Sequence, residues 1–472
     1  MSLIALLTLG CISPKDALDT SETAAPPETG IEETGLEETG LDTPPVFFKN
    51  PLEAADLDPR DEVVRVQLTA APYTYESAGT IIEGWAYNQQ VPGPTIRVPL
   101  GARLEVELIN QLENGTTIHW HGVHVPWEMD GVVWMGEPIQ SGTEFTYAFT
   151  PDQSPGTFWY HPHYDTQRQV DLGLYGTLLI EDPSEPRVDH ELIAVLDSTG
   201  EFGAGDLEGV HHGLEATNIE WTVNALHKPV YPAKSGDSIR LRILNASNTG
   251  YAYLKIPGAR QIAGDQGILP QPKTLEMEPL LLAPGDRSDV EILLTGDLEI
   301  LSAPYNHNGG EAFGEDQVVF RIEASDDTLS EEEPELLDWP FTHQTPSNDP
   351  GRTDIRWTLT GDPRTGSWEI NGETFPDVTI PELSLNEEAI LEVRNMSATE
   401  HPFHLHGHAF EVLSINGESP QWAMLEDTIN IPIRGIARLR LVANNPGDWM
   451  AHCHILSHPH GGMMTVLRVN DP

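Results

Sequence analysis

The sequence predicts an all-β chain of three β-sandwich domains, and two repeated patterns together with the length support this prediction. The first pattern is a strand of alternating apolar and polar residues that ends at an asparagine. It reads GARLEVELIN at 101–110, GDSIRLRILN at 236–245 and EAILEVRN at 388–395. The second is a related set of alternating strands at 142–149, 285–293 and 435–442. The chain has 472 residues, which at about 150 residues per domain also suggests about three domains.

The boundaries of the three copies follow from changes in composition. Short alternating runs, separated by Gly, Pro and Asn, favour strands over helices throughout the region. Acidic or proline-containing stretches at 182–187 and 326–340 lie between the copies. We therefore expect sandwich domains at 55–183, 187–325 and 345–472.

The amino-terminal segment has a different character. Residues 1–11, MSLIALLTLGC, are uncharged and similar to the apolar part of a secretory signal. The Gly10-Cys11 pair is similar to a bacterial lipoprotein processing site, which predicts export to the periplasm or cell surface and a lipid anchor on Cys11. The alternative is a mis-assigned start with an incidental cysteine.

Residues 12–54 are predicted to form a disordered acidic linker. The pentapeptide EETGL occurs twice, at 32–36 and 37–41, and residues 12–46 hold nine acidic residues and one lysine. Such a composition buries too little apolar surface to fold by itself. A tether between an anchor and a folded body is the interpretation we favour, and a plain disordered leader is the alternative.

Composition excludes several classes of function. With 25 basic and 74 acidic side chains the formal net charge is −49, which opposes binding to nucleic acid or to an anionic membrane surface. Two cysteines cannot supply a disulfide scaffold or a four-cysteine zinc site. No run reaches the ~18 apolar residues of a membrane-spanning helix.

The histidines gather in pairs that the two outer copies share. TIHWHG at 117–122 matches PFHLHG at 402–407, PGTFWYHPH at 155–163 matches PGDWMAHCH at 446–454, and the middle copy has neither. Residues i and i+2 of a strand share one face, so each His-x-His pair offers two adjacent imidazoles. One such pair is commonly a surface pair, but four in matching positions predict a metal site, with copper the strongest divalent binder among Cu, Fe and Zn.

The third copy adds four possible ligands, which are His401, Cys453, His458 and Met463. The matching positions of the first copy are Thr116, Pro162, Gln167 and Leu172, which cannot form the same site. Two imidazoles, a thiolate and a thioether are the ligands of a blue-copper electron-transfer centre. The alternative for Cys453 is a buried apolar thiol.

Four motifs resemble those of the multicopper oxidases, a family that includes laccases, cuprous oxidases, bilirubin oxidases and ferroxidases. They are HWHG at 119–122, HPH at 161–163, HPFHLHG at 401–407 and HCHILSHPHGGM at 452–463. VPGPTIRV at 91–98 and LLAPGDRSDVEI at 281–292 extend the resemblance over nearly the whole body. It implies that the three domains are cupredoxin-like Greek-key β-sandwiches.

The resemblance also implies four copper ions and their ligands. A type 1 copper would lie on His401, Cys453 and His458 with Met463 as a weak axial ligand, and a type 2 copper on His119 and His404. The two type 3 coppers would be held by six histidines, which are His121, His161, His163, His406, His452 and His454.

An oxidase mechanism is implied in the same way. Single electrons from a small reducing substrate would enter at the type 1 copper and reach the other three coppers through Cys453, where O2 would be reduced to water. Asp130, eleven residues after His119, matches an acidic residue that assists protonation in bacterial members; the alternative is a turn residue before Gly131. Several bacterial relatives place a glutamate at the position of Pro459, so a second proton relay must come from elsewhere or be absent.

Two classes of reducing substrate fit the sequence. We expect a laccase-like oxidase of phenols or aromatic amines, because the nine methionines are dispersed and form no methionine-rich insertion of the cuprous-oxidase kind. Oxidation of Cu(I), Fe(II) or Mn(II), which an acidic surface would concentrate, is the second candidate. A non-catalytic copper-binding periplasmic protein is disfavoured because every implied oxidase ligand is present. A copper nitrite reductase is disfavoured because such enzymes lack the paired type 3 site. His408 and His460 lie beside implied type 1 ligands; we expect surface or packing roles for them, and contact with the substrate is the alternative.

Overall fold

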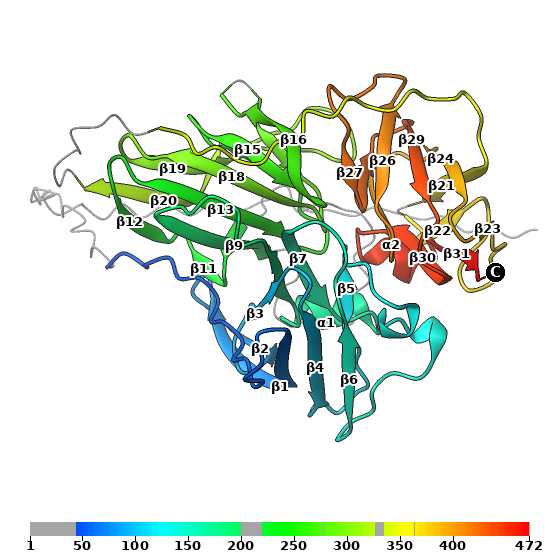
Figure 1. Cartoon of the computed structure of the whole chain (residues 1–472), viewed down its shortest axis with the longest axis horizontal. Coiled ribbons are helices and arrows are strands. Elements are labelled where there is room, and N and C mark those ends of the chain that lie inside the picture. The colour runs from blue at the N-terminus through cyan, green and yellow to red at the C-terminus, as the bar shows by residue number, and fades with distance from the viewer. Residues whose placement is uncertain (1–43, 200–219, 277, 326–334, 363, 472) are drawn as a thin grey trace, which may run out of the picture. The chain divides into compact units, whose positions relative to one another are not determined.

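A computed structural model describes residues 44–199, 220–276, 278–325, 335–362 and 364–471. The predicted signal segment with Cys11 and most of the predicted linker lie outside these residues. The described chain is almost entirely β-structure and forms three two-sheet sandwiches, coloured blue to cyan, green and orange to red in Figure 1. The predicted fold class is confirmed.

The first sandwich consists of two four-stranded sheets. The first sheet has the order β2 (Thr80–Tyr87), β1 (Val63–Ser77), β4 (Arg103–Asn110) and β6 (Glu144–Phe149). The second has the order β3 (Gly93–Pro99), β8 (Gly176–Glu181), β7 (Gly156–His161) and β5 (His119–His121). Its short helices are η1 (Trp127–Met129), η2 (Val133–Met135) and α1 (Thr166–Asp171).

The middle sandwich packs a seven-stranded sheet on a five-stranded one. The larger sheet has the order β11 (Leu226–His227), β10 (Glu220–Val223), β9 (His190–Thr199), β13 (Ser238–Asn245), β18 (Arg287–Leu293), β15 (Arg260–Gly264) and β16 (Gly267–Thr274). The smaller has the order β12 (Val230–Lys234), β20 (Gln317–Ser325), β19 (Leu298–Ser302), β14 (Ala252–Lys255) and β17 (Leu280–Leu282).

The third sandwich has a six-stranded and a five-stranded sheet. The former has the order β22 (Ser367–Ile370), β21 (Ile355–Asp362), β24 (Glu388–Asn395), β29 (Ile436–Val442), β26 (Phe410–Ile415) and β27 (Leu425–Glu426). The latter has the order β23 (Glu382–Ser384), β31 (Met464–Asn470), β30 (Gly447–Cys453), β25 (His401–Leu405) and β28 (Thr428–Ile431). Helix α2 (Ser457–His460) follows β30.

The asparagine that ends each repeated strand makes the same kind of hydrogen bonds in all three sandwiches. Asn110, Asn245 and Asn395 are fully buried, and each accepts a backbone hydrogen bond on Oδ1 from the residue two positions later. Each Nδ2 also donates to the carbonyl oxygen of a residue four or five positions later. An amide supplies both donors and an acceptor, so this side chain ties the end of the strand to the loop that follows.

The outer sandwiches share one apolar core. Buried residues of the first sandwich, such as Trp120 and Leu108, belong to the same continuous cluster as Phe403 and Leu439 of the third, whereas most of the middle core forms a cluster of its own. Burial of apolar surface is the main favourable term in such packing. The strands that carry the histidine motifs are therefore brought together between the first and third sandwiches.

The folded body begins earlier than the predicted boundary at residue 55. Phe48 is only 5% exposed and its ring lies 5.3 Å from that of Phe320, while its N–H donates to Val230 O at 2.9 Å. The N–H of Ala54 donates to Thr95 O at 2.8 Å. The linker prediction therefore needs correction for residues 45–54, because the acidic pentapeptide composition that favours disorder gives way to an apolar Phe47-Phe48 pair there.

Among the residues that the structure describes, no helix is long and apolar enough to cross a membrane.

Candidate metal centre

Strand pairing places the His-x-His pairs of each outer sandwich face to face. In the first sandwich β5 pairs with β7, so that His119 is opposite His161. In the third, β25 pairs with β30, so that His404 is opposite His452. Opposite residues of antiparallel strands have neighbouring side chains. Each outer sandwich therefore presents four imidazoles on one surface.

The eight imidazoles form three groups in which the ring nitrogens lie within 4.8 Å of one another. Every group contains histidines of both outer sandwiches, so neither sandwich completes a group alone. Figure 1 shows β5 and β7 beside α2 and β30, the region where these residues meet. The groups are His119, His121 and His404; His121, His161 and His454; and His163, His406 and His452.

A fourth group contains the thiol. Sγ of Cys453 lies 3.4 Å from His401 Nδ1 and 3.3 Å from His458 Nδ1, and the two nitrogens are 3.1 Å apart. The indole of Trp368 lies 3.7 Å from the imidazole of His458 and fixes its plane. Met463 is fully buried, and its backbone is hydrogen-bonded to both Cys453 and His458. Three of the four residues predicted as one ligand set thus bring their side chains together, and Met463 adjoins two of them through its backbone.

Burial determines the charge of these groups. It lowers the pKa of His401 and of His452 to about 3, and it holds the pKa of His121, His161 and His163 well below the ordinary value. The same holds for His406, His454 and His458. Burial also raises the pKa of the Cys453 thiol. These eight imidazoles are therefore neutral and keep a lone pair for a metal ion.

Asp130 connects histidines of the two outer sandwiches. Its side chain is 1% exposed, with Oδ1 3.0 Å from His119 Nδ1 and Oδ2 2.8 Å from His406 Nδ1. A carboxylate accepts, so both Nδ1 atoms carry the proton and both Nε2 atoms carry the lone pair. The next residue has φ +75°, and a Cβ there would lie 1.7 Å from Ile118 O, so Gly131 is required to bring Asp130 this close.

The inward-facing ring nitrogens of these histidines are suited to binding a cation. Among the described residues, Nε2 of His119, His161 and His404 and Nδ1 of His121 have no hydrogen-bond partner although they are buried. Nδ1 of His406 is at hydrogen-bond distance from Asp130, and Nδ1 of His452 is at hydrogen-bond distance from Cys453 O. Nε2 of His406 lies 3.0 Å from Nε2 of His452. Two lone pairs at this distance repel unless a cation binds them. Imidazoles with one thiol and one thioether are the donors that copper prefers.

The sequence motifs did not identify the buried residues that lie behind these histidines. Asp427 Oδ1 lies 3.0 Å from His121 Nε2, and Asp427 O lies 2.9 Å from His404 Nδ1. Arg287 donates to both carboxylate oxygens, at 2.8 and 2.5 Å, and holds the pKa of Asp427 well below its ordinary range. Only the stretch LLAPGDRSDVEI, noted for its resemblance, signalled Arg287.

Two further predicted positions take different places. Pro459 lies in α2, directly after His458, and brings no carboxylate to the site. His408 is buried, whereas His460 is exposed.

Three sandwiches with these four ligand groups define a copper-binding redox protein. Residues 70–185 and 346–472 match the multicopper oxidase family. The multicopper oxidase MmcO of Mycobacterium tuberculosis is 30% identical over 449 residues, which cover 86% of each chain. Laccase-5 of Trametes villosa is 26% identical over 79% of this chain and 84% of its own. A multicopper oxidase structure from Campylobacter jejuni, described as a metallo-oxidase, has a TM-score of 0.75 and 26% identity over 91% of this chain and 96% of its own.

The chain belongs to the multicopper oxidase family, and the resemblance seen in its motifs is confirmed. It is a copper-dependent oxidoreductase that uses O2 as electron acceptor and takes electrons from a reducing substrate.

Proposed function

We propose that this protein is a laccase-like oxidase that couples one-electron oxidation of phenols or aromatic amines to the four-electron reduction of O2 to water. The observation that carries the coupling is the place of Cys453, whose thiol belongs to one ligand group while its neighbours His452 and His454 belong to two others. A covalent path one residue long therefore joins the thiol group to the imidazole groups.

We propose one copper ion at each of four positions. His401, Cys453 and His458, with Met463 as a further donor, would hold the type 1 ion, and His119 and His404 would hold the type 2 ion. We assign the six remaining histidines to two sets of three, following the distances between their ring nitrogens. The sets are His121, His161 and His454, and His163, His406 and His452. The bound copper supplies one-electron transfer and O2 reduction.

The residues of the chain orient the ligands and keep water away. Asp130 holds the N–H of His119 and of His406, and Asp427 holds that of His121. Such partners fix which ring nitrogen carries the proton. Asp130 and Asp427 both touch imidazoles of the two outer sandwiches. Because Asp427 is paired with Arg287, we assign the proton-supplying role to Asp130.

Aromatic side chains beside the thiol group favour an aromatic substrate. The rings of Tyr305 and His307 both stack on Tyr251, at 5.4 and 4.8 Å, and Tyr305 and His307 are partly exposed. His307 O accepts from the N–H of Glu400, the residue before His401. A phenol ring could stack on this partly exposed aromatic surface close to a type 1 ligand.

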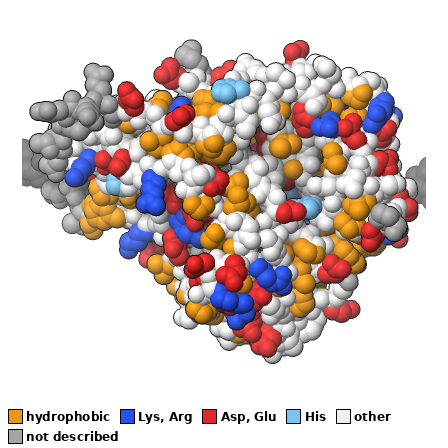
Figure 2. All heavy atoms as spheres, viewed as in Figure 1, with side chains coloured by type: hydrophobic (Ala, Val, Ile, Leu, Met, Phe, Trp, Pro, Cys, Tyr) orange, Lys and Arg blue, Asp and Glu red, His pale blue; other side chains and the backbone are white. Residues whose placement is uncertain are grey.

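Oxidation of reduced metal ions is the second candidate, and Glu400 is the observation in its favour. Its carboxylate accepts from Tyr305 Oη at 2.9 Å and from Asn430 Nδ2 at 2.6 Å, next to His401. Over the face shown in Figure 2, acidic side chains are interspersed with basic and apolar ones. General attraction of cations by this face would therefore be diffuse, and Glu400 would have to bind the ion.

An oxygen electrode tests both candidates on the copper-loaded protein. O2 uptake with a phenol, lost in Cys453→Ser together with the blue thiolate absorption, is the expected result. Full phenol oxidation by Cys453→Ser would overturn the electron path.

Two variants distinguish phenol oxidation from oxidation of reduced metal ions. Tyr305→Leu should raise KM for phenols about threefold to tenfold, the value of one aromatic contact, and leave KM for Fe(II) and Cu(I) unchanged, while Tyr305→Phe keeps the ring and serves as control. If Glu400→Gln instead raises KM for Fe(II) or Cu(I), and those ions turn over faster than phenols, the metal-oxidase function replaces the laccase-like one.

A further inference from the structure

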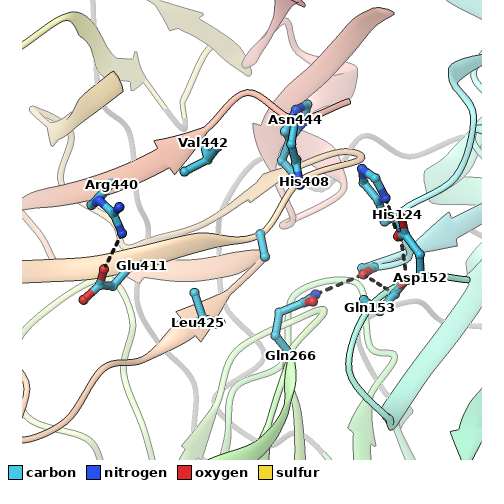
Figure 3. A pocket seen from close by; sticks show the side chains of 12 residues that line it. His124, Asp152, Gln153, Gln266, His408, Glu411, Leu425, Arg440, Val442 and Asn444 are labelled. Carbon is cyan, nitrogen blue, oxygen red and sulfur yellow. Dashed lines mark hydrogen bonds and ion pairs between the residues drawn. The ribbon is translucent and has the colours of Figure 1, made fainter. Parts of the chain in front are cut away.

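A polar pocket lies where the three sandwiches meet, and its imidazoles belong to none of the four ligand groups. His124 and Asp152 come from the first sandwich, Gln266 from the middle one, and His408, Glu411 and Arg440 from the third. Figure 3 shows these side chains around the pocket. Gln266 separates the pocket from Asp427, because its Nε2 donates to Gly122 O and to Asp427 Oδ2.

His408 presents an unsatisfied nitrogen to this pocket. Its side chain is 5% exposed, and its ring meets that of Trp449 edge to face at 5.5 Å. Nδ1 lies 3.3 Å from His406 O, which can only accept, so Nδ1 carries the proton. The lone pair is therefore on Nε2, which is buried and has no hydrogen-bond partner in the described part of the chain.

His124 repeats this arrangement from the other side of the domain junction. Nδ1 lies 2.5 Å from Asp152 Oδ1, and the backbone N–H donates to Gln153 Oε1 at 3.1 Å. The carboxylate accepts, so the lone pair of His124 is again on Nε2, which is also buried without a partner among the described residues. An imidazole whose second nitrogen donates to a carboxylate or a backbone carbonyl is the arrangement typical of metal ligands.

The charges around the two imidazoles suit a cation. Asp152 and Glu411 are acidic, and the guanidinium of Arg440, the basic group of the lining, is shared between Glu411 and Glu388. Two buried nitrogen lone pairs in one pocket each cost free energy if nothing binds them. An apolar molecule would leave that cost in place, whereas a metal ion with imidazole preference removes it.

We propose that this pocket binds a divalent transition-metal ion through Nε2 of His124 and Nε2 of His408. The ion is of the imidazole-preferring class represented by Zn²⁺ and Cu²⁺. It is additional to the copper of the proposed function and joins the first sandwich to the third. The site therefore stabilises the domain junction.

Zn²⁺ binding by the copper-loaded protein tests the proposal, because Zn²⁺ takes no part in electron transfer. Isothermal titration calorimetry, with metal analysis after dialysis, should show one equivalent of Zn²⁺ bound while the copper content and the blue absorption stay constant. Bound Zn²⁺ should also raise the melting temperature.

Variants assign the ligands. His124→Ala, at a partly exposed position, should weaken Zn²⁺ binding at least about tenfold, and Asp152→Asn, which leaves the imidazole but removes its carboxylate, should weaken it less. His408→Gln should match His124→Ala, and its blue absorption reports whether it folds. His190→Ala removes the imidazole of another His–Asp pair, His190 with Asp237 at 2.7 Å, and should bind Zn²⁺ as the unaltered protein does. Equal Zn²⁺ affinity in the unaltered protein and His124→Ala, or less than one equivalent bound, would overturn the proposal.

Discussion

Asp427 and His121 lie 306 residues apart in the chain, yet Oδ1 of the carboxylate is 3.0 Å from Nε2 of the imidazole. The contact leaves Nδ1 of His121 facing the ligand groups, whereas His119, His161 and His404 present Nε2. Arg287, from the middle sandwich, donates to the same carboxylate. The middle sandwich carries no motif histidine, but it holds a ligand in place through this ion pair.

Replacing Arg287 should lower the free energy of unfolding more than replacing an exposed charged residue does. Arg287 is also 3.3 Å from the buried Asp265. Arg287→Met therefore leaves the carboxylates of Asp427 and Asp265 without their cation, and breaking a buried pair in this way typically costs about 3–5 kcal/mol. We expect a clear drop in the urea midpoint of the copper-free protein. Arg321→Met is the matched control, because Arg321 and its partner Glu299 are about half exposed and exposed pairs contribute about 1 kcal/mol or less. Equal midpoints for the two variants would contradict the role of Arg287.

Removing the carboxylate of Asp130 should loosen copper. Asp130→Ala leaves the Nδ1–H of His406 without its acceptor and leaves that of His119 only the backbone carbonyl of residue 130. Loss of such a partner usually weakens metal binding about 10-fold to 100-fold. Competition with a chelator, followed by copper analysis, measures this. Asp237→Ala, which removes the partner of His190 in the middle sandwich, should retain copper normally. If Asp130→Ala also retained all its copper but lost O2 turnover, the predicted role in copper binding would be wrong. Asp130 would then have only the proton-supplying role.

The sequence predicted local features well and long-range ones poorly. Period-two strands ending at Asn110, Asn245 and Asn395 were recognisable because alternation and the terminal amide are local. The His-x-His pairs were recognisable because spacing alone puts two imidazoles on one strand face. Asp427 sits in a strand region without any motif, and its meeting with His121 depends on how two sandwiches pack. No spacing rule contains that information.

Copper binding at the thiol group should strengthen as pH rises. Burial raises the pKa of the Cys453 thiol, so a proton must leave when copper binds, whereas His401, with a pKa of about 3, is already neutral near pH 7. One proton released per ion corresponds to about tenfold higher affinity per pH unit. The blue absorption, titrated against a copper buffer at pH 6, 7 and 8, measures the slope. A flat response would contradict the buried neutral thiol.

Acid should unfold the copper-free protein over a narrow range. A histidine that titrates near 6.5 when unfolded and near 3 when folded, as for His401 and His452, binds its proton more tightly in the unfolded chain. Stability is therefore complete above about pH 6.5 and falls with pH below it, by about 2 kcal/mol per histidine at pH 5. With several such histidines, the copper-free protein should lose its fold between about pH 6 and pH 5, and copper should shift the transition to lower pH. His307, with a pKa of about 4, is outside the ligand groups, so His307→Phe should make the acid transition shallower without altering copper binding; an unchanged pH dependence of the melting temperature in this variant would contradict the assignment.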